Sequence, residues 1–327
     1  MKILFAGTPE IAVPSLKVLS REFEIAGVLT APDKISGRGR KITPSPVKKA
    51  ALDLNLKVLQ PERLGRDARE ETASLNADIL VVFAYGKIFG PKFLDLFPLG
   101  GINMHPSALP KYRGPSPVTA VILAGEKETA LTVQKIALKL DSGDIIRQTP
   151  FPLDGSETTE SLTRKISESA PGELSAALKQ IEQGQVNAVA QDESKATYCR
   201  IIVKEDGIID WNKPASVLER EVRAYYPWPK SVTSLNGSVL TVLKAKVVLS
   251  GIPDNTVEDS KWYNRSVYEN AVPGTVLGVD KLHGILIKTG RGVLGVLRLQ
   301  LASRKPLDFK SFLNGVKMEN GTVLGDN

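Results

Sequence analysis

The stretch Gly101-Ile-Asn-Met-His-Pro-Ser-Ala-Leu-Pro-Lys-Tyr-Arg-Gly114 decides how we expect this chain to fold. Its first five residues form a short strand pattern that ends at a proline, where a loop begins. Because side chains alternate along a strand, Ile102 and Met104 share one face and can be buried. Asn103 and His105 share the other face, about 7 Å apart by the strand's rise per residue. They stand at the end of the strand where open α/β sheets bind ligands.

An amide beside an imidazole suits acyl-transfer chemistry. The amide N–H donates to an oxygen that gains negative charge. The imidazole titrates near neutrality and can act as a base. A structural histidine in a turn fits the same short pattern, so other parts of the chain must distinguish a catalytic histidine from a structural one.

The composition limits the class of protein. The 327 residues are enough for two domains, and 42% hydrophobic with 24% charged residues is ordinary for a globular protein. The single cysteine, Cys199, excludes an internal disulfide and indicates a reducing compartment. The sequence opens on a strand and turn pattern and not on a targeting peptide, so we expect a cytoplasmic protein. One cysteine and two histidines cannot form the usual zinc sites, and we expect no catalytic metal. The apolar runs are too short to span a membrane. The net charge of +7 permits a polyanionic partner without requiring one.

The first half of the chain alternates strands and helices. Strands are predicted at Lys2–Ala6, Glu24–Leu29 and Asp78–Phe83, and a helix begins at Pro14. This order predicts an α/β domain with a Rossmann-like, mostly parallel sheet. The turn after the first strand lacks the G-x-G-x-x-G pattern, which disfavours a dinucleotide-dependent dehydrogenase.

The pattern changes toward the C-terminus. Two strands near 129–136 and 144–150 flank a loop, and one or two helices follow at 157–183, interrupted at Pro171. We expect residues 1–188 to form the first domain and residues 189–208 a linker. Residues 209–327 contain short strands with turn residues between them and few helices, which predicts a smaller, OB-like β-barrel domain.

Residues 31–45 have no hydrophobic period, and we expect a loop without regular structure there. Its cations are Lys34, Arg38, Arg40 and Lys41, set between glycines and prolines. Such a loop can place cations on phosphates. A solvated basic loop fits the same composition equally well.

With these residues placed, the chain resembles the formyltetrahydrofolate-dependent formyltransferases, and among them those that act on methionyl-tRNA. The motifs of the first domain are Phe5-Ala-Gly-Thr-Pro9, Gly37-Arg-Gly-Arg-Lys41 with Pro44-Ser-Pro-Val-Lys48, Asn103-Met-His-Pro-Ser-Ala-Leu-Pro110 with Tyr112-Arg-Gly114, and Leu140-Asp-Ser-Gly-Asp144. Ile209-Asp-Trp211 and Tyr226-Pro-Trp-Pro229 match the second domain of the tRNA-acting members.

The resemblance implies an activity: transfer of the formyl group of 10-formyltetrahydrofolate to the α-amine of methionyl-initiator tRNA. The family's catalytic residues fall on Asn103, His105 and Asp141. Asn103 and a protonated His105 would stabilise the oxyanion, or His105 would act as a base. Asp141 would fix the imidazole tautomer and raise the pKa of His105.

The resemblance also implies ligand contacts. The expected folate-binding residues are Ser107, Ala108, Leu109, Pro110, Tyr85 and Gly86, with Ala108 replacing a leucine of the family pattern. The expected tRNA-binding residues are Arg38, Arg40, Lys41, Lys244 and Lys246. The two C-terminal lysines fit a solvated surface equally well. We expect a monomer with no membrane partner.

Two other functions fit parts of the sequence. One is a folate-dependent formyltransferase or hydrolase that acts on a small molecule, and the basic insertion around Arg38 argues against it. The other is a tRNA-binding module without catalysis, which would not need the Asn103, His105 and Asp141 set.

Overall fold

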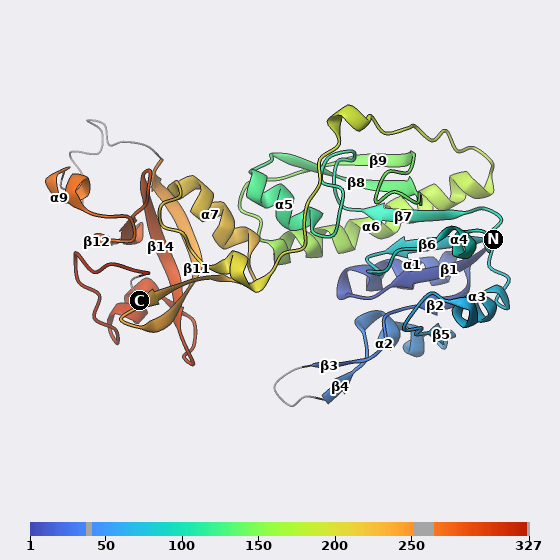
Figure 1. Ribbon diagram of the computed structural model, residues 1–327, viewed down its shortest axis with the longest axis horizontal. Helices are drawn as coiled ribbons and strands as arrows, with labels where there is room; N and C mark the ends of the chain where they lie inside the picture. The colour runs from blue at the N-terminus through green and yellow to red at the C-terminus, as the bar shows by residue number, and fades with distance from the viewer. Residues whose placement is uncertain (37–40, 251–264, 326–327) are drawn as a thin grey trace. The chain divides into compact units, whose positions relative to one another are not determined.

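The computed structural model describes residues 1–36, 41–250 and 265–325 (Figure 1). The chain divides into two compact units. The first consists of Met1–Val121, Lys127–Leu153 and Ser161–Ile201, and the second of Ile122–Glu126, Asp154–Glu160 and Ile202–Asn327. Of the residues expected as a linker, those up to Ile201 therefore group with the first unit.

A seven-stranded sheet forms the centre of the first unit, in the order β5-β2-β1-β6-β7-β8-β9. Its strands are β1 (Lys2–Gly7), β2 (Glu24–Leu29), β5 (Val58–Leu59), β6 (Ile79–Phe83), β7 (Gly101–His105), β8 (Glu128–Lys135) and β9 (Ile145–Pro152). The first five run parallel, while β8 and β9 are antiparallel to their neighbours. The predicted Rossmann-like, mostly parallel sheet is confirmed.

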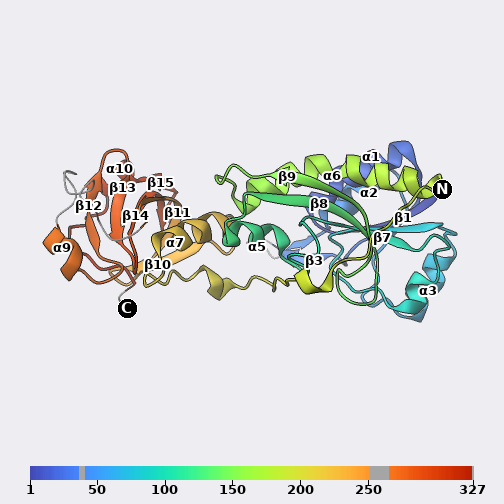
Figure 2. The ribbon, with the colours of Figure 1, turned by 90° about the horizontal axis from the view of Figure 1, so that it is seen from above.

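Helices cover both faces of this sheet. They are α1 (Val13–Glu22), α2 (Pro46–Asp53), α3 (Arg66–Ala73), α4 (Pro91–Leu94), α5 (Pro117–Ala124) and α6 (Thr159–Glu182), with short 3-10 turns η1 (Glu10–Ala12) and η2 (Glu193–Lys195). A third 3-10 turn, η3 (Lys204–Gly207), belongs to the second unit. In Figure 2, α1, α2 and α6 lie along one face and α3 lies on the other. Phe93 of α4 and Phe97 just after it pack with Leu80 and Val82 of β6 on that second face.

The strand order reverses between β1 and β6. From β1 the chain proceeds outward to β2 and β5, then returns to β6 on the other side of β1. Ligands of open α/β sheets bind outside the carboxyl ends of the strands at such a reversal. There Thr8 Oγ1 donates to the Tyr85 carbonyl oxygen at 3.0 Å. Val82 pairs with Asn103, so the end of β7 lies beside this region.

Two local predictions were wrong. The basic loop contains an antiparallel hairpin, β3 (Lys34–Ser36) and β4 (Lys41–Thr43), in which Ile35 pairs with Ile42. A single apolar residue per strand gives no visible period, which is why the sequence pattern missed it. Helix α6 also continues through Pro171 as one helix.

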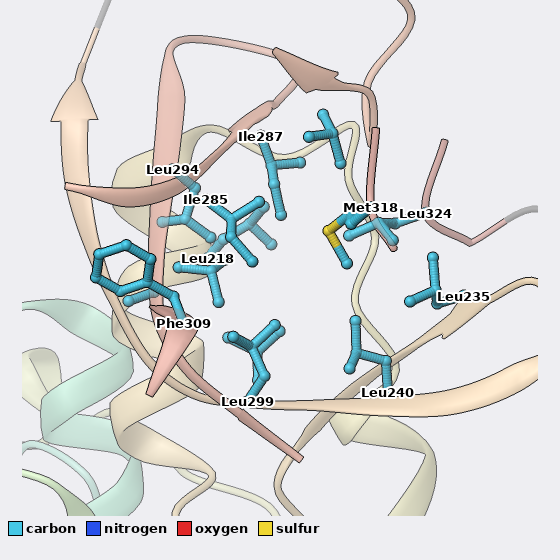
Figure 3. Packing of buried hydrophobic residues seen from close by; sticks show 14 of the residues in the cluster. Leu218, Leu235, Leu240, Ile285, Ile287, Leu294, Leu299, Phe309, Met318 and Leu324 are labelled. Atoms are coloured by element: carbon cyan, nitrogen blue, oxygen red, sulfur yellow. The ribbon is translucent and has the colours of Figure 1, made fainter. Parts of the chain in front are cut away.

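The second unit is a six-stranded antiparallel sheet, as predicted for a small β domain. Its strands are β10 (Ser231–Leu235), β11 (Ser238–Leu249), β12 (Val276–Asp280), β13 (Gly284–Lys288), β14 (Val293–Leu301) and β15 (Leu307–Asp308), and its helices include α7 (Ala215–Ala224), α9 (Arg265–Asn270) and α10 (Phe309–Leu313). Figure 3 shows side chains of these elements meeting in one core, among them Leu240, Ile285 and Leu299. In the described part of the chain no helix has the length and apolar character needed to cross a membrane.

Candidate active site

The structure brings together the three side chains expected to be catalytic. Asn103 and His105 project from β7, and Asp141 lies in the loop between β8 and β9. The Nδ1 atom of His105 is 3.7 Å from Asp141 Oδ2, and the Nδ2 atom of Asn103 is 3.5 Å from Asp141 Oδ1. Ile102 and Met104, on the opposite strand face, are buried as predicted.

The turn that presents Asp141 has an unusual backbone. Asp141 has a φ of 47°, in the left-handed region that short polar side chains tolerate best. A Cβ atom on Gly143 would lie 1.8 Å from the Lys135 carbonyl oxygen, so only glycine fits there. The backbone geometry of this turn therefore explains why an aspartate and a glycine stand at positions 141 and 143.

Three N–H groups hold the Asp141 carboxylate. The Gly114 backbone donates to Oδ2 at 2.8 Å, and the Gln134 amide donates to Oδ1 at 3.2 Å. Asn103 is the third donor. Gly114 has a φ of +115°, and a Cβ there would lie 2.4 Å from the Cys199 carbonyl oxygen. The glycine that ends the Tyr112-Arg-Gly motif thus lets a backbone N–H reach the carboxylate.

The His105 ring has a defined tautomer. Its Nε2 atom is 2.9 Å from the Tyr112 carbonyl oxygen. A carbonyl only accepts hydrogen bonds, so Nε2 carries the hydrogen and, in the neutral ring, Nδ1 carries the lone pair. The Tyr112 carbonyl fixes the tautomer, whereas we expected Asp141 to do so. The basic atom, Nδ1, faces Asp141.

Burial determines the charge of His105. The residue is 4% exposed, and burial lowers the pKa of His105 below its ordinary value. The Asp141 carboxylate and the Tyr112 carbonyl act in the opposite direction but are smaller causes. Asp141 thus raises the pKa of His105 as expected, but burial outweighs this effect and the net shift is downward. A neutral imidazole near pH 7 favours the base alternative over the protonated donor.

The lowered pKa of His105 predicts how stability changes with pH. The unfolded chain binds a proton at histidine's ordinary pKa, while the folded chain binds it only at lower pH. Stability from this residue is therefore present above about pH 6.5 and lost as the pH falls below it. We expect the urea midpoint of the wild-type chain to fall between about pH 7.5 and about pH 5 more than that of His105→Gln. Equal falls would contradict the assignment.

The carbonyl oxygens of the expected folate-binding turn already accept hydrogen bonds from other groups of the protein. The carbonyl oxygens of Ser107, Ala108 and Leu109 accept from Thr132 Oγ1, Lys111 N and Gln148 Nε2, respectively. Ser107 and Leu109 are buried, and Ala108 and Pro110 are partly exposed. Its carbonyl oxygens already have donors, so this turn is better suited to contact the face of a flat ring than to hydrogen-bond to its edge.

In the loop after β6, the two residues expected to bind folate lie in different environments. Tyr85 is 3% exposed and its ring stacks on Phe89 at 5.4 Å between centroids. Burial raises the pKa of Tyr85 to about 12. This ring therefore belongs to the core and is not placed to stack on a folate. Gly86 is exposed, with a φ of +87° and no atom within 4 Å of a would-be Cβ. Its backbone is open to a ligand.

The expected tRNA-binding residues are distributed over both units. Arg38, Arg40 and the Lys41 side chain lie outside the described residues. Lys244 is exposed and Lys246 partly exposed on β11, with the buried Ala245 between them. Both lysines are therefore on the outer side of the second unit's sheet. Within the described residues, no group of three His, Cys, Asp or Glu side chains could hold a metal ion.

Residues that the sequence did not single out surround the site. Gln134 is 1% exposed and Arg113 is fully buried, and both join Asp141 to the segment after α6 through Gln191. The signal for Gln134 was a polar residue inside an apolar strand. Nothing distinguished Gln191 from its solvated neighbours.

Family models match both parts of the chain. The model described as formyl transferase matches residues 1–178, and the one described as formyl transferase, C-terminal domain, matches residues 201–317. The chain therefore belongs to the formyl transferase family.

Individual relatives are more specific. Methionyl-tRNA formyltransferase of Treponema denticola is 45% identical over 323 residues, which cover 96% of this chain and 97% of that protein. The enzyme of the same name from Treponema pallidum is 42% identical, with 96% of each chain covered. The crystal structure of WlaRD, a sugar 3N-formyl transferase in the presence of dTDP and 5-N-formyl-THF, superimposes with a TM-score of 0.62 at 20% identity, over 93% of this chain and 99% of that one. That last likeness concerns the fold alone.

Proposed function

We propose that this chain transfers the formyl group of 10-formyltetrahydrofolate to the α-amine of methionine esterified to initiator tRNA. The proposal is supported by the full-length similarity to methionyl-tRNA formyltransferases. The observation that supports the chemistry is the contact set of one neutral imidazole, one carboxylate and one amide at the end of β7. The folate supplies the activated formyl group.

His105 is the base in this proposal. Nδ1 accepts the proton that the methionine amine loses as its nitrogen bonds to the formyl carbon. The resulting imidazolium is stabilised by the Asp141 carboxylate, 3.7 Å away. When the bond between the formyl carbon and the folate nitrogen breaks, His105 returns the proton to that nitrogen. The proton balance closes without another co-reactant.

Asn103 stabilises the negative charge that develops on the formyl oxygen. Its Nδ2 carries two hydrogens, and one is directed at Asp141 Oδ1 over 3.5 Å. The other can donate to the oxyanion. A donor placed in this way typically contributes about 3–4 kcal/mol to the transition state.

The residues around the site fit a folate. The open backbone at Gly86 can meet the pterin edge, which alternates donors and acceptors, and Ala108 and Pro110 can contact its face. Leu138 and Leu140, 64% and 47% exposed beside Asp141, provide apolar surface for the methionine side chain.

The acceptor is tested with three amines. Labelled formyl donor is incubated with the chain and charged initiator tRNA, charged elongator methionyl-tRNA or a sugar amine. We expect rapid transfer to initiator tRNA and slower transfer to the elongator. Transfer to the sugar amine without transfer to tRNA would contradict the proposal and support the small-molecule alternative.

Arg38→Ala is expected to affect the tRNA and not the folate. Loss of one phosphate or base contact should raise the KM for tRNA about 10-fold and lower the slope of its salt dependence by about one. Arg66→Ala is the matched control, because Arg66 in α3 is 82% exposed and pairs with Glu70 on the same helix. If Arg38→Ala raised the KM for folate as much as that for tRNA, the loop would be structural.

A further inference from the structure

The segment that follows α6 is hydrogen-bonded to the loop that follows β7. Arg113 N donates to the Thr197 carbonyl oxygen at 2.9 Å, and Cys199 N donates to the Arg113 carbonyl oxygen at 2.8 Å. The two stretches thus form an isolated parallel β-bridge between Arg113 and Tyr198. The Arg113 side chain is fully buried and reaches Gln191 and Glu193 of the same segment. A stretch that looked like a linker is part of the active-site surroundings.

Arg113 fixes the orientation of the Gln191 amide. Its Nε and Nη2 atoms lie 3.0 and 2.8 Å from Gln191 Oε1. A guanidinium only donates, so the amide oxygen must face it and the amide nitrogen must face away. Gln191 Nε2 lies 2.9 Å from the Asp141 carbonyl oxygen and 2.7 Å from that of Gly143. The amide thereby holds the backbone on both sides of the catalytic turn.

The same amide also reaches the Asp141 carboxylate through Gln134. Gln191 Nε2 lies 3.0 Å from Gln134 Oε1, and Gln134 Nε2 donates to Asp141 Oδ1 at 3.2 Å. Every donor in this series points from the guanidinium toward the carboxylate. Because Arg113 cannot accept and an ionised Asp141 cannot donate, neither amide can turn over without losing bonds at both ends.

We infer that Gln191 is a positioning residue that sets where the Asp141 carboxylate stands relative to His105. This inference rests on the proposed function for its catalytic consequence. Gln191 is hydrogen-bonded directly to the main chain of Asp141, and it is connected to the Asp141 side chain through Gln134. Replacing it should let the turn relax and move the carboxylate away from Nδ1.

The ring pKa of His105 reports that movement without any substrate. The chain has two histidines, so in a His283→Gln background His105 is the only one, and NMR follows its ring directly. The groups that face His105 are the Asp141 carboxylate and the Tyr112 carbonyl, with the Cys199 thiol beside that carbonyl. In that background, the further substitution Gln191→Met keeps the length of the side chain and removes the hydrogen bonds of the Gln191 amide. We expect the pKa of His105 to fall by about half a unit to one unit.

Gln185→Met is the matched control, because Gln185 is an exposed glutamine on the same segment after α6. It should leave the His105 titration unchanged. An unchanged titration in Gln191→Met would overturn the inference. The titration needs neither folate nor tRNA, so its result stands whether or not the proposed reaction is correct.

Gln191→Glu separates positioning from a merely structural role. Glutamate keeps oxygen acceptors for Arg113 but has no N–H for the carbonyls of Asp141 and Gly143. We expect kcat to fall about 10-fold while the KM for folate changes less than about twofold. If Gln191 only accepted hydrogen bonds from the buried guanidinium, glutamate would serve as well. Wild-type kcat in this variant would therefore contradict the inference.

Discussion

Replacing His105 with glutamine should lower the rate of formyl transfer by about 10²- to 10⁴-fold. The reason lies in the two ring nitrogens. Glutamine can still donate an N–H to the Tyr112 carbonyl, as Nε2 does, so the local fold is retained. It has no basic nitrogen in place of Nδ1. The rate is measured by rapid quench with charged initiator tRNA, under single turnover.

His283→Gln is the control for this substitution. His283 lies in the second unit and its Nδ1 atom contacts Asp280 at 2.6 Å, so it is a histidine with a carboxylate partner outside the proposed site. Its replacement should leave the rate within about twofold of wild type. If His105→Gln transferred formyl at the wild-type rate, the base would have to be another group.

Asp141→Asn should also lower the rate by about 10²- to 10⁴-fold. Its three partners, from Asn103, Gln134 and Gly114, are all N–H donors. An asparagine would direct its own N–H group at one of them and rotate away. The negative charge that stabilises protonated His105 would also be lost. The pKa of His105 should therefore fall further, and NMR titration of the ring measures it.

Asp144→Asn provides a matched control three residues away. Asp144 is 45% exposed and its Oδ2 atom is 3.6 Å from Lys135 Nζ at the surface. We expect its replacement to change the rate less than about twofold, because exposed ion pairs contribute little. Equal losses for Asp141→Asn and Asp144→Asn would mean that the whole turn, and not the buried carboxylate, matters.

Part of the site followed from local sequence alone. Strand alternation and the proline after His105 were sufficient to place an amide and an imidazole together at the end of β7. Asp141 lies beyond two further elements, and no local pattern connects it to His105. Its assignment required the family resemblance.

Other features depend on packing that local patterns do not encode. The neutral state of His105 follows from its burial, which neighbouring elements produce. Gln191 stands in the polar run Gln-Asp-Glu-Ser-Lys and looks solvated. Its contacts exist only because Arg113, distant in the chain, is buried against it. Tyr85 shows the reverse: an aromatic residue at a loop suggested ligand stacking, but the core contains its ring.

The most direct measurement is a crystal structure of this chain with a formyl-folate that cannot transfer its formyl group. We expect the formyl oxygen about 3 Å from Asn103 Nδ2 and the formyl carbon beside His105 Nδ1. We also expect Asp141 still in contact with the ring. A formyl group bound away from the end of β7, with Asn103 and His105 both facing protein atoms only, would contradict it.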